Sequence, residues 1–181
     1  EAGLTMPNHW GYGFLTPTVK YRSVSYELDD FPLLEDDSPD AGSLMASLDG
    51  GLIFERQTSL FSNKMTQTLE PRAYYLYSEY EEQSGQPDFD SAELTFSYDQ
   101  LYRDTRFSGH DRIDDADQLS LGVTSRFIDN ASGNETLRAS IGQIFYFRER
   151  EVRLNQIDPD LTESTSAIAA ELALSPSRKW Q

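Results

Sequence analysis

The sequence predicts an all-β fold of antiparallel up-and-down strands that form part of a large transmembrane outer-membrane β-barrel. Three observations lead to this prediction. Apolar and polar residues alternate over long runs, the connections between these runs alternate between long and short, and aromatic residues stand near the ends of the runs. No apolar run approaches the roughly 18 residues of a transmembrane helix, but a transmembrane strand needs only about 9–11 residues of alternating polarity.

The composition narrows the function classes. The 181 residues include 31 acidic and 15 basic residues, for a net charge of -16, so a nucleic-acid partner is not expected. The absence of Cys excludes disulfides and thiolate metal sites, and two His leave little material for zinc, so we expect no metal and no cofactor. The chain opens on Glu1 without a signal peptide, which suggests a piece of a longer protein.

Period-two alternation is clearest from Ser43 to Phe54, where apolar residues occupy the even positions. A helix would not keep that face, because its apolar positions recur every three or four residues. The same pattern predicts six membrane strands, at residues 13–26, 43–56, 65–77, 116–128, 136–148 and 164–175, in one barrel section that covers residues 1–181. Since even the smallest outer-membrane barrels need about eight strands, we expect further strands outside this set.

The connections predict an up-and-down arrangement. Long loops at 27–42, 78–115 and 149–163 alternate with short turns at 57–64 and 129–135. This pattern is typical of a barrel with tight turns at one rim and long loops at the other, whereas an immunoglobulin-like sandwich spaces its turns more evenly. The alternating segment Ser91–Asp99 would break the scheme as a full strand, so we expect a short strand or helix folded over or into the barrel mouth.

The two sides of the predicted strands differ in chemistry. One side is rich in Leu, Val, Ala and Ile, with Tyr or Phe near the strand ends, and the other is polar, which favours lipid on one side and a water-filled lumen on the other. The candidate lumen-facing residues are Lys20, Arg22, Glu70, Arg72, Arg126 and Arg138. Pro17 and Pro71 are predicted to face lipid in mid-strand, where the missing N–H must make the ladder bulge or weaken.

Five stretches carry a resemblance to a known family. They are "WGYGFLTPTVKY" (Trp10–Tyr21), "TQTLEPRAYYLY" (Thr66–Tyr77), "FDSAELTFSYDQLYRDTRFSGHDRI" (Phe89–Ile113), "ADQLSLGVTSRFID" (Ala116–Asp129) and "ASIGQIFYF" (Ala139–Phe147). In order and spacing they resemble the C-terminal barrel of the LptD family of lipopolysaccharide (LPS) assembly proteins. The resemblance covers about Trp10 to Phe147, and the tail from Arg148 is less distinctive.

The resemblance implies a function and a set of partners. Proteins of this family lie in the Gram-negative outer membrane as multi-pass barrels and insert LPS into its outer leaflet through a lateral opening. The implied partners are LPS, membrane lipids, the lipoprotein LptE in the barrel lumen, and the periplasmic bridge component LptA through an N-terminal domain that this section lacks. The chain would then be an internal section of the barrel without either gate strand.

Two groups of residues are candidates for contacts with these partners. The lumen-facing residues given above either orient LPS or contact the plug, or they pair with lumenal acids such as Glu70 and Glu171 and only stabilise the barrel. A second group mixes charge with apolar side chains and suggests an ordered loop that docks on the lumenal lipoprotein or the barrel mouth. It contains Leu101, Tyr102, Arg103, Phe107, His110, Arg112 and Ile113.

Two alternative functions remain open at this point. An omptin-type outer-membrane protease would use His110 with nearby acids (Asp111, Asp114, Asp115 and Asp117), but those proteases take their pairs from different strands, and one His in an acidic run is usually solvated. We therefore expect no enzymatic activity. A soluble β-sandwich binding module would stay in solution without detergent. The acidic loop at 27–42 is either a solvated loop or a place that recruits divalent cations.

Overall fold

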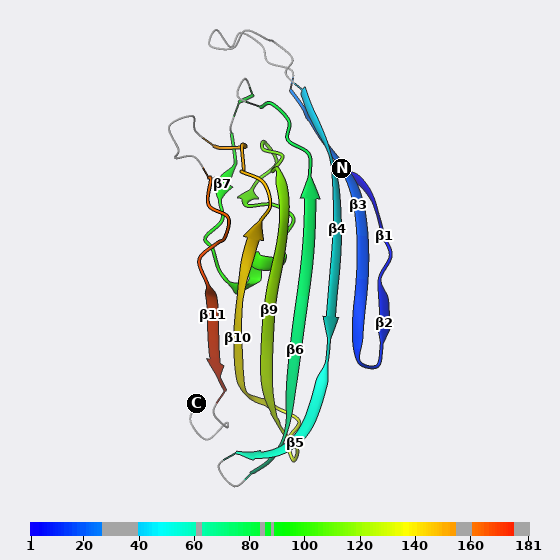
Figure 1. The fold of residues 1–181 in the computed structure, drawn as a ribbon, viewed down its shortest axis with the longest axis vertical. Helices are drawn as coiled ribbons and strands as arrows, with labels where there is room; N and C mark the ends of the chain where they lie inside the picture. Colours follow the sequence, from blue (N-terminus) through cyan, green and yellow to red (C-terminus); the bar gives the residue numbers. More distant parts are fainter. Residues whose placement is uncertain (27–39, 61–62, 84–85, 88, 155–160, 176–181) are drawn as a thin grey trace.

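The computed structural model describes residues 1–26, 40–60, 63–83, 86–87, 89–154 and 161–175. Its main feature is one antiparallel sheet of long strands that lie side by side (Figure 1). The strands of this sheet are β1 (Ala2–Thr5), β2 (Asn8–Trp10), β3 (Gly13–Ser25), β4 (Asp40–Leu52), β5 (Phe54–Leu60), β6 (Asn63–Ser78), β9 (Ala116–Asp129), β10 (Glu135–Tyr146) and β11 (Ala169–Leu174). The all-β antiparallel prediction is confirmed.

The strand order follows the chain. It runs β1-β3-β4-β6-β9-β10-β11, while β2 pairs with β3 and β5 pairs with β6. Each long strand from β3 to β10 pairs with the next long strand along the chain, as in an up-and-down sheet. Within the described residues a second packed sheet of the kind that makes a sandwich is not formed. No helix in the described ranges is long and apolar enough to cross a membrane. The acidic run at 27–39 lies outside the described residues.

Two parts of the main sheet differ from the ranges expected from sequence. The pair β1 and β2 precedes the first predicted strand and forms a hairpin with β3, from Ala2 opposite Tyr21 to Trp10 opposite Gly13. Proline and glycine in this stretch interrupt the polar–apolar alternation, which explains why the pattern does not reveal it. At the other end β11 is shorter than 164–175, because Phe145 and Thr165 form only an isolated bridge.

The long connection between β6 and β9 folds back onto the sheet. Residues 89–115, called the insert below, contain β7 (Ala92–Glu93), the short 3-10 helix η1 (Tyr98–Tyr102) and β8 (Phe107–Ser108), and β7 pairs with β8. The segment Ser91–Asp99 therefore forms a two-residue strand and the start of a helical turn, and it does not join the main sheet. The insert lies beside the upper halves of β9 and β10 (Figure 1).

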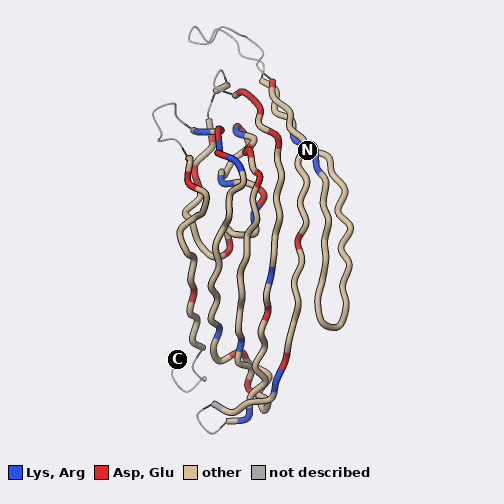
Figure 2. Tube along the Cα trace, in the orientation of Figure 1, with Lys and Arg blue, Asp and Glu red and all other residues tan. Residues whose placement is uncertain are grey.

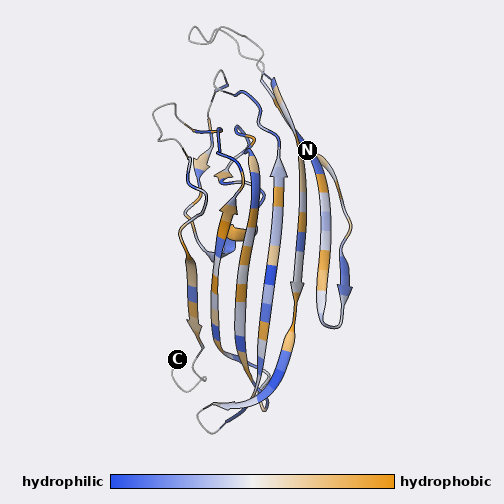
Figure 3. Ribbon diagram, viewed as in Figure 1, coloured by the Kyte–Doolittle hydropathy of each residue, from blue (hydrophilic) through white to orange (hydrophobic). Residues whose placement is uncertain are grey.

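The two faces of the main sheet have opposite burial. Apolar side chains are open on one face, called the apolar face: Leu121 in the central strand β9 is 42% exposed, while its neighbour Ser120 is 0% exposed. Further exposed apolar residues on that face are Leu15, Val19, Leu44, Leu48, Leu69, Tyr75, Ile141, Leu172 and Leu174. The other face, called the polar face, is covered by the insert at one end. Figure 3 shows the colour alternation along long strands such as β6 and β9. This burial is the reverse of a soluble core.

Pro17 lies opposite a break between β1 and β2. The pairs on both sides of the break, Thr5 with Thr18 and Asn8 with Leu15, keep one register, so there is no bulge. The Met6 N–H donates to the Pro17 carbonyl at 3.0 Å, but Pro17 has no N–H for the return bond. The Asn8 side-chain amide instead donates to the Met6 carbonyl at 3.0 Å. The ladder is weakened here without any change of register.

Pro71 produces the same arrangement in the middle of the sheet. The ladder of β6 with β4 ends at the pair Gly51 and Arg72, and the ladder of β6 with β5 begins at Phe54 and Leu69, again in one register. On its other side β6 stays paired with β9 straight through Pro71, which opposes Val123. Opposite each proline, one neighbouring strand is thus interrupted, so the missing N–H falls at a gap in the ladder.

Candidate functional site

The polar face carries the predicted lumen-facing residues in two groups. The upper group, in β3, holds the insert: Lys20 Nζ lies 2.9 Å and Arg22 Nη2 lies 2.8 Å from the same Asp104 oxygen. Burial would raise the pKa of Asp104, but the hydrogen bond from Lys20 and the charge of Arg22 hold that pKa below its ordinary value. Asp104 therefore stays ionised and fastens the insert to β3.

Lower on the same face, Arg72 links the sheet to η1. Its guanidinium makes a bidentate pair with Asp49, with distances of 2.9 Å and 2.6 Å, and lies 3.9 Å from the centre of the Tyr102 ring. A bidentate, stacked guanidinium fixes both direction and distance, which Lys would not do in the same position. Arg72 therefore holds η1 and β4 in one arrangement.

A row of ion pairs crosses the polar face next to Arg72. Arg126 pairs with Glu70 at 3.1 Å and with Glu135 at 2.8 Å, and Arg138 pairs with Glu171 at 3.1 Å. Arg126 and Arg138 are direct cross-strand neighbours, so the acids around them offset a repulsion between like charges. All six predicted lumen-facing residues are thus ion-paired, as the stabilising alternative expects, and Figure 2 shows where charged residues lie along the strands.

The insert is seated on two glycines of the sheet. Gly122 and Gly142 are paired across β9 and β10, and a Cβ on Gly142 would lie 2.5 Å from Leu101 Cδ1. A Cβ on Gly122 would likewise collide with the Tyr102 hydroxyl. Because both positions lack a side chain, η1 approaches the sheet closely and Leu101 is 0% exposed.

Hydroxyl groups continue this contact across the sheet. The Tyr98 hydroxyl lies 3.1 Å from that of Tyr102 and 3.1 Å from Thr124 Oγ1, which in turn lies 3.0 Å from Ser140 Oγ. The buried polar groups under η1 therefore satisfy one another, which favours one fixed position of the insert.

The other loop candidates divide between buried and exposed positions. Phe107 and Ile113 are buried within this chain, as Leu101 is, and Arg112 donates to the main-chain carbonyls of Gln86 and Pro87. The apolar side chains of Leu101, Phe107 and Ile113 are therefore buried by this chain itself. Arg103 and His110 are exposed.

Two of the acids considered for a protease, Asp111 and Asp114, hold the insert, while Asp117 accepts a hydrogen bond from Tyr75 in β6. Tyr26 donates to Asp111 at 2.6 Å, and although burial would raise the pKa of Asp111, the bonds from Tyr26 and from the Asp90 backbone lower it to about 2. Asp114 pairs with Arg106 at 2.7 Å, yet burial raises the pKa of Asp114 above its ordinary value. These contacts are typical of structural carboxylates, and His110 lies exposed.

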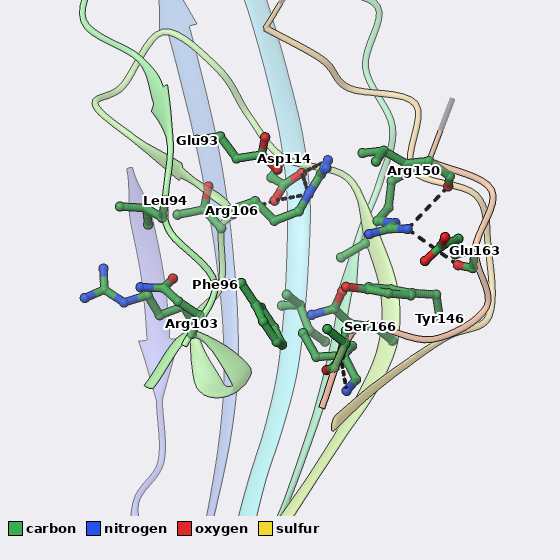
Figure 4. A pocket seen from close by; sticks show the side chains of 18 of the residues that line it. Glu93, Leu94, Phe96, Arg103, Arg106, Asp114, Tyr146, Arg150, Glu163 and Ser166 are labelled. Carbon is green, nitrogen blue, oxygen red and sulfur yellow. Dashed lines mark hydrogen bonds and ion pairs between the residues drawn. The ribbon is translucent and has the colours of Figure 1, made fainter. Parts of the chain in front are cut away.

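A cavity of about 480 Å³ lies between the insert, the polar face and residues 161–167 (Figure 4). Three arginines line it, namely Arg103, Arg106 and Arg150, together with apolar side chains such as Phe96 and Ile144. Sequence reasoning missed Arg150, which follows β10 in a stretch without a clear pattern. The only signal was its place in the charged run "FRERE".

Comparison with known proteins identifies the family. The family model described as "LptD: LPS transport system D" matches residues 1–181. The LPS-assembly protein LptD of Xanthomonas campestris pv. campestris (strain 8004) is 50% identical over 157 residues, which cover 84% of this chain and 19% of that protein. The protein of the same name from Pseudomonas aeruginosa (strain LESB58) is 45% identical over 178 residues, covering 93% of this chain and 19% of that protein.

A third relative extends over the whole chain. The LPS-assembly protein LptD of Ectopseudomonas mendocina (strain ymp) is 43% identical over an alignment of 202 residues that covers 100% of this chain and 21% of that protein. The chain thus spans about a fifth of the length of these relatives. The resemblance seen in the sequence is confirmed, and the chain belongs to the LptD family.

Proposed function

We propose that this chain is part of the outer-membrane translocon that inserts LPS into the outer leaflet of the Gram-negative outer membrane. The observation that carries the proposal is the inverted burial of the sheet, with Leu121 open and Ser120 covered in one strand. Such a sheet would aggregate in water and is stable with lipid against its apolar face. The names of the relatives support LPS assembly as the process.

The proposal assigns an orientation to the sheet. The apolar face, including Pro17 and Pro71, lies against lipid, and the polar face lines a lumen that strands outside this chain help to enclose. A strand as long as β6, with 16 residues, extends roughly 50 Å at about 3.3 Å per residue, enough to cross a tilted path through the membrane. The long connections lie at the outer rim, as in other outer-membrane barrels, so the insert closes part of the outer mouth.

The proposal also assigns partners to the polar face. The implied plug is the lipoprotein LptE, and the implied donor of LPS is the periplasmic bridge component LptA, which acts through an N-terminal domain of the whole protein. Because the cations of the ion-pair row are already paired, an LPS phosphate or a plug residue must compete there with Glu70 or Glu171. The exposed Arg103 and His110 are the better candidates for docking. The role is transport, without a catalytic step in this chain.

Photocrosslinking in cells tests this proposal. A photoreactive residue replaces Arg103 in the full-length protein, and a second one replaces Leu172 on the apolar face as a control. We expect Arg103 to give an adduct with a small lipoprotein or with LPS. We expect Leu172 to give no adduct with a protein. Recovery of the full-length protein in the soluble fraction without detergent would contradict the proposal, as would the same protein adduct from both positions.

A further inference from the structure

A buried cluster under the insert contains more cations than it can pair. Arg106 and Arg148 approach the two carboxylates of the cluster: Arg106 lies 2.7 Å from Asp114, and Arg148 lies 3.7 Å from Asp115. Asp115 also accepts the backbone N–H groups of Glu151 and Val152, each at 3.0 Å. Both carboxylates are therefore used, so the third arginine, Arg150, has no ion-pair partner among the described residues.

Arg150 is buried and poorly satisfied. It is 9% exposed, and no carboxylate in the described part of the chain forms an ion pair with it. Within that part of the chain its guanidinium reaches only the main-chain carbonyls of Leu161 and Glu163, each at a long 3.5 Å, and its Nε has no hydrogen-bond partner there. Burial lowers the pKa of Arg150 from its ordinary value. Such a cation is costly unless an anion joins it.

The side chain of Arg150 faces the cavity described above (Figure 4). It lies flat over Tyr146, with 3.6 Å between the guanidinium carbon and the ring centre. Phe96, Ile144 and Leu161 provide apolar walls, and Ser166 and Gln100 add polar groups. The acids Glu93, Asp114 and Glu163 also line the cavity, and Asp114 is taken up by Arg106. A volume of about 480 Å³ is within the range of small-molecule sites. Among the described residues, the cavity therefore combines two arginines without an ion pair, the exposed Arg103 and the buried Arg150, with a mostly apolar wall.

We propose that this cavity binds a phosphate group carried on an apolar body, with Arg150 as the anion-binding residue. The planar fork of Arg150 matches two phosphate oxygens, and Phe96 and Tyr146 contact the apolar part. The cavity has more room and more polar groups than a single acidic side chain of a protein partner would use, which favours an amphiphile over a peptide. The inferred source is a phosphate of LPS, and this last step rests on the proposed function.

Binding to the purified full-length protein with its lipoprotein tests the site itself. Hexyl phosphate and inorganic phosphate are titrated by ³¹P NMR, and hexanol is titrated by calorimetry. We expect hexyl phosphate to bind more tightly than either of the others, and Arg150→Gln to weaken it at least about tenfold. Arg150→Lys keeps the charge without the fork and should fall between the two. Arg56→Gln, whose guanidinium bonds the Gln67 side chain outside the cavity, should bind like the unchanged protein.

Three results of the titration would overturn the site. Equal affinity for hexyl phosphate in Arg150→Gln and the unchanged protein would show that Arg150 does not hold the anion. Equal affinity for inorganic phosphate and hexyl phosphate would remove the apolar part of the proposal. Equal affinity for hexanol and hexyl phosphate would remove the anionic part. A difference in gel mobility between unboiled and boiled samples confirms in each case that the variant barrel is folded. If Arg150→Gln does not fold, Arg150→Lys provides the comparison.

A photoreactive residue at Phe96 in cells tests the source of the phosphate. We expect an adduct with LPS that is lost in Arg150→Gln. An adduct with a lipoprotein or another protein at Phe96 would overturn the lipid source and favour an acidic side chain. If hexyl phosphate binds in vitro but no LPS adduct forms at Phe96, the inferred source fails while the site stands. The proposed function fails only if Arg103 also gives no adduct with LPS or a lipoprotein, so the two failures are distinguishable.

Discussion

Leu101 packs directly on Gly142, and its Cδ1 atom lies 2.5 Å from the place that a Cβ on Gly142 would take. This contact joins the insert to the middle of the polar face. It explains why a loop of mixed charge has a fixed position: the sheet provides a flat patch at Gly122 and Gly142, and the insert provides Leu101 and Tyr102 to fill it.

A side chain at Gly142 should displace the insert. We expect Gly142→Ala to cost about 1–3 kcal/mol, because the added methyl overpacks the site that Leu101 fills and also lies 2.7 Å from the Leu121 carbonyl oxygen of the neighbouring strand. Limited proteolysis of the full-length protein in detergent, with cleavage mapped to residues 89–115, measures this. Gly11→Ala is the matched control, since a Cβ there meets nothing within 4 Å. Equal cleavage of both variants would show that the glycine patch does not seat the insert.

The Asp104 pair with Lys20 and Arg22 should hold the insert over a wide pH range. Because the folded-state pKa of Asp104 is lowered, its contribution is fully present above the ordinary Asp value of about 3.9 and is lost as pH falls through the lower folded value. We expect cleavage of the insert to be unchanged from pH 7 to pH 5. At neutral pH Asp104→Asn should increase it roughly tenfold, for a loss of about 1–2 kcal/mol.

Asp99 supplies the control for Asp104. It lies in the same insert, is exposed, and Asp99→Asn changes the charge equally. Cleavage that rises as much in Asp99→Asn as in Asp104→Asn would mean that net charge, rather than the ion pair, governs the insert.

Glu70 and Arg126 should stabilise the barrel through their mutual attraction, so changing one of them should be offset by exchanging both. We expect Arg126→Glu to lower the temperature at which the barrel loses its folded gel mobility, because it places a third acid near Glu70 and Glu135. The exchange Glu70→Arg with Arg126→Glu should recover most of the loss, which we expect to be about 1 kcal/mol for these half-exposed groups. A double variant no better than Arg126→Glu alone would show that the row contributes no pairwise energy.

The Asn8 side chain should contribute to the stability of the barrel mainly while Pro17 is present. Its side-chain amide donates a hydrogen bond to the Met6 carbonyl, to which Pro17 cannot donate because it has no N–H. In lipid an unpaired carbonyl is costly, so we expect Asn8→Ala to destabilise the barrel by about 1 kcal/mol and to cost much less in Pro17→Ala, where a new N–H faces Met6. A double-mutant cycle on thermal stability measures the coupling, and additive effects would contradict it.

Alternation made the faces of the sheet predictable, because every second side chain of a strand points the same way. That is why Arg126 and Arg138 could be placed on the polar face from sequence. The hairpin of β1 and β2 could not, since Gly3, Pro7 and Gly11 break its pattern. The contact of Leu101 with Gly142 depends on the pairing of β9 with β10, which follow the insert along the chain. The lack of an ion pair at Arg150 among the described residues depends on which carboxylates its neighbours take, and no spacing in the sequence encodes that.

Spin labels along β9 test the central claim, that the apolar face lies in lipid and the polar face does not. This chain contains no Cys, so single Cys positions at 121, 123, 125 and 127 and at 122, 124, 126 and 128 of the full-length protein can carry the label if its other thiols are replaced. We expect oxygen, which is concentrated in lipid, to relax the odd positions most strongly, with a period of two residues. Water-soluble nickel reagents should not reach those odd positions. Odd positions open to the nickel reagent, or an oxygen profile without alternation, would contradict the account.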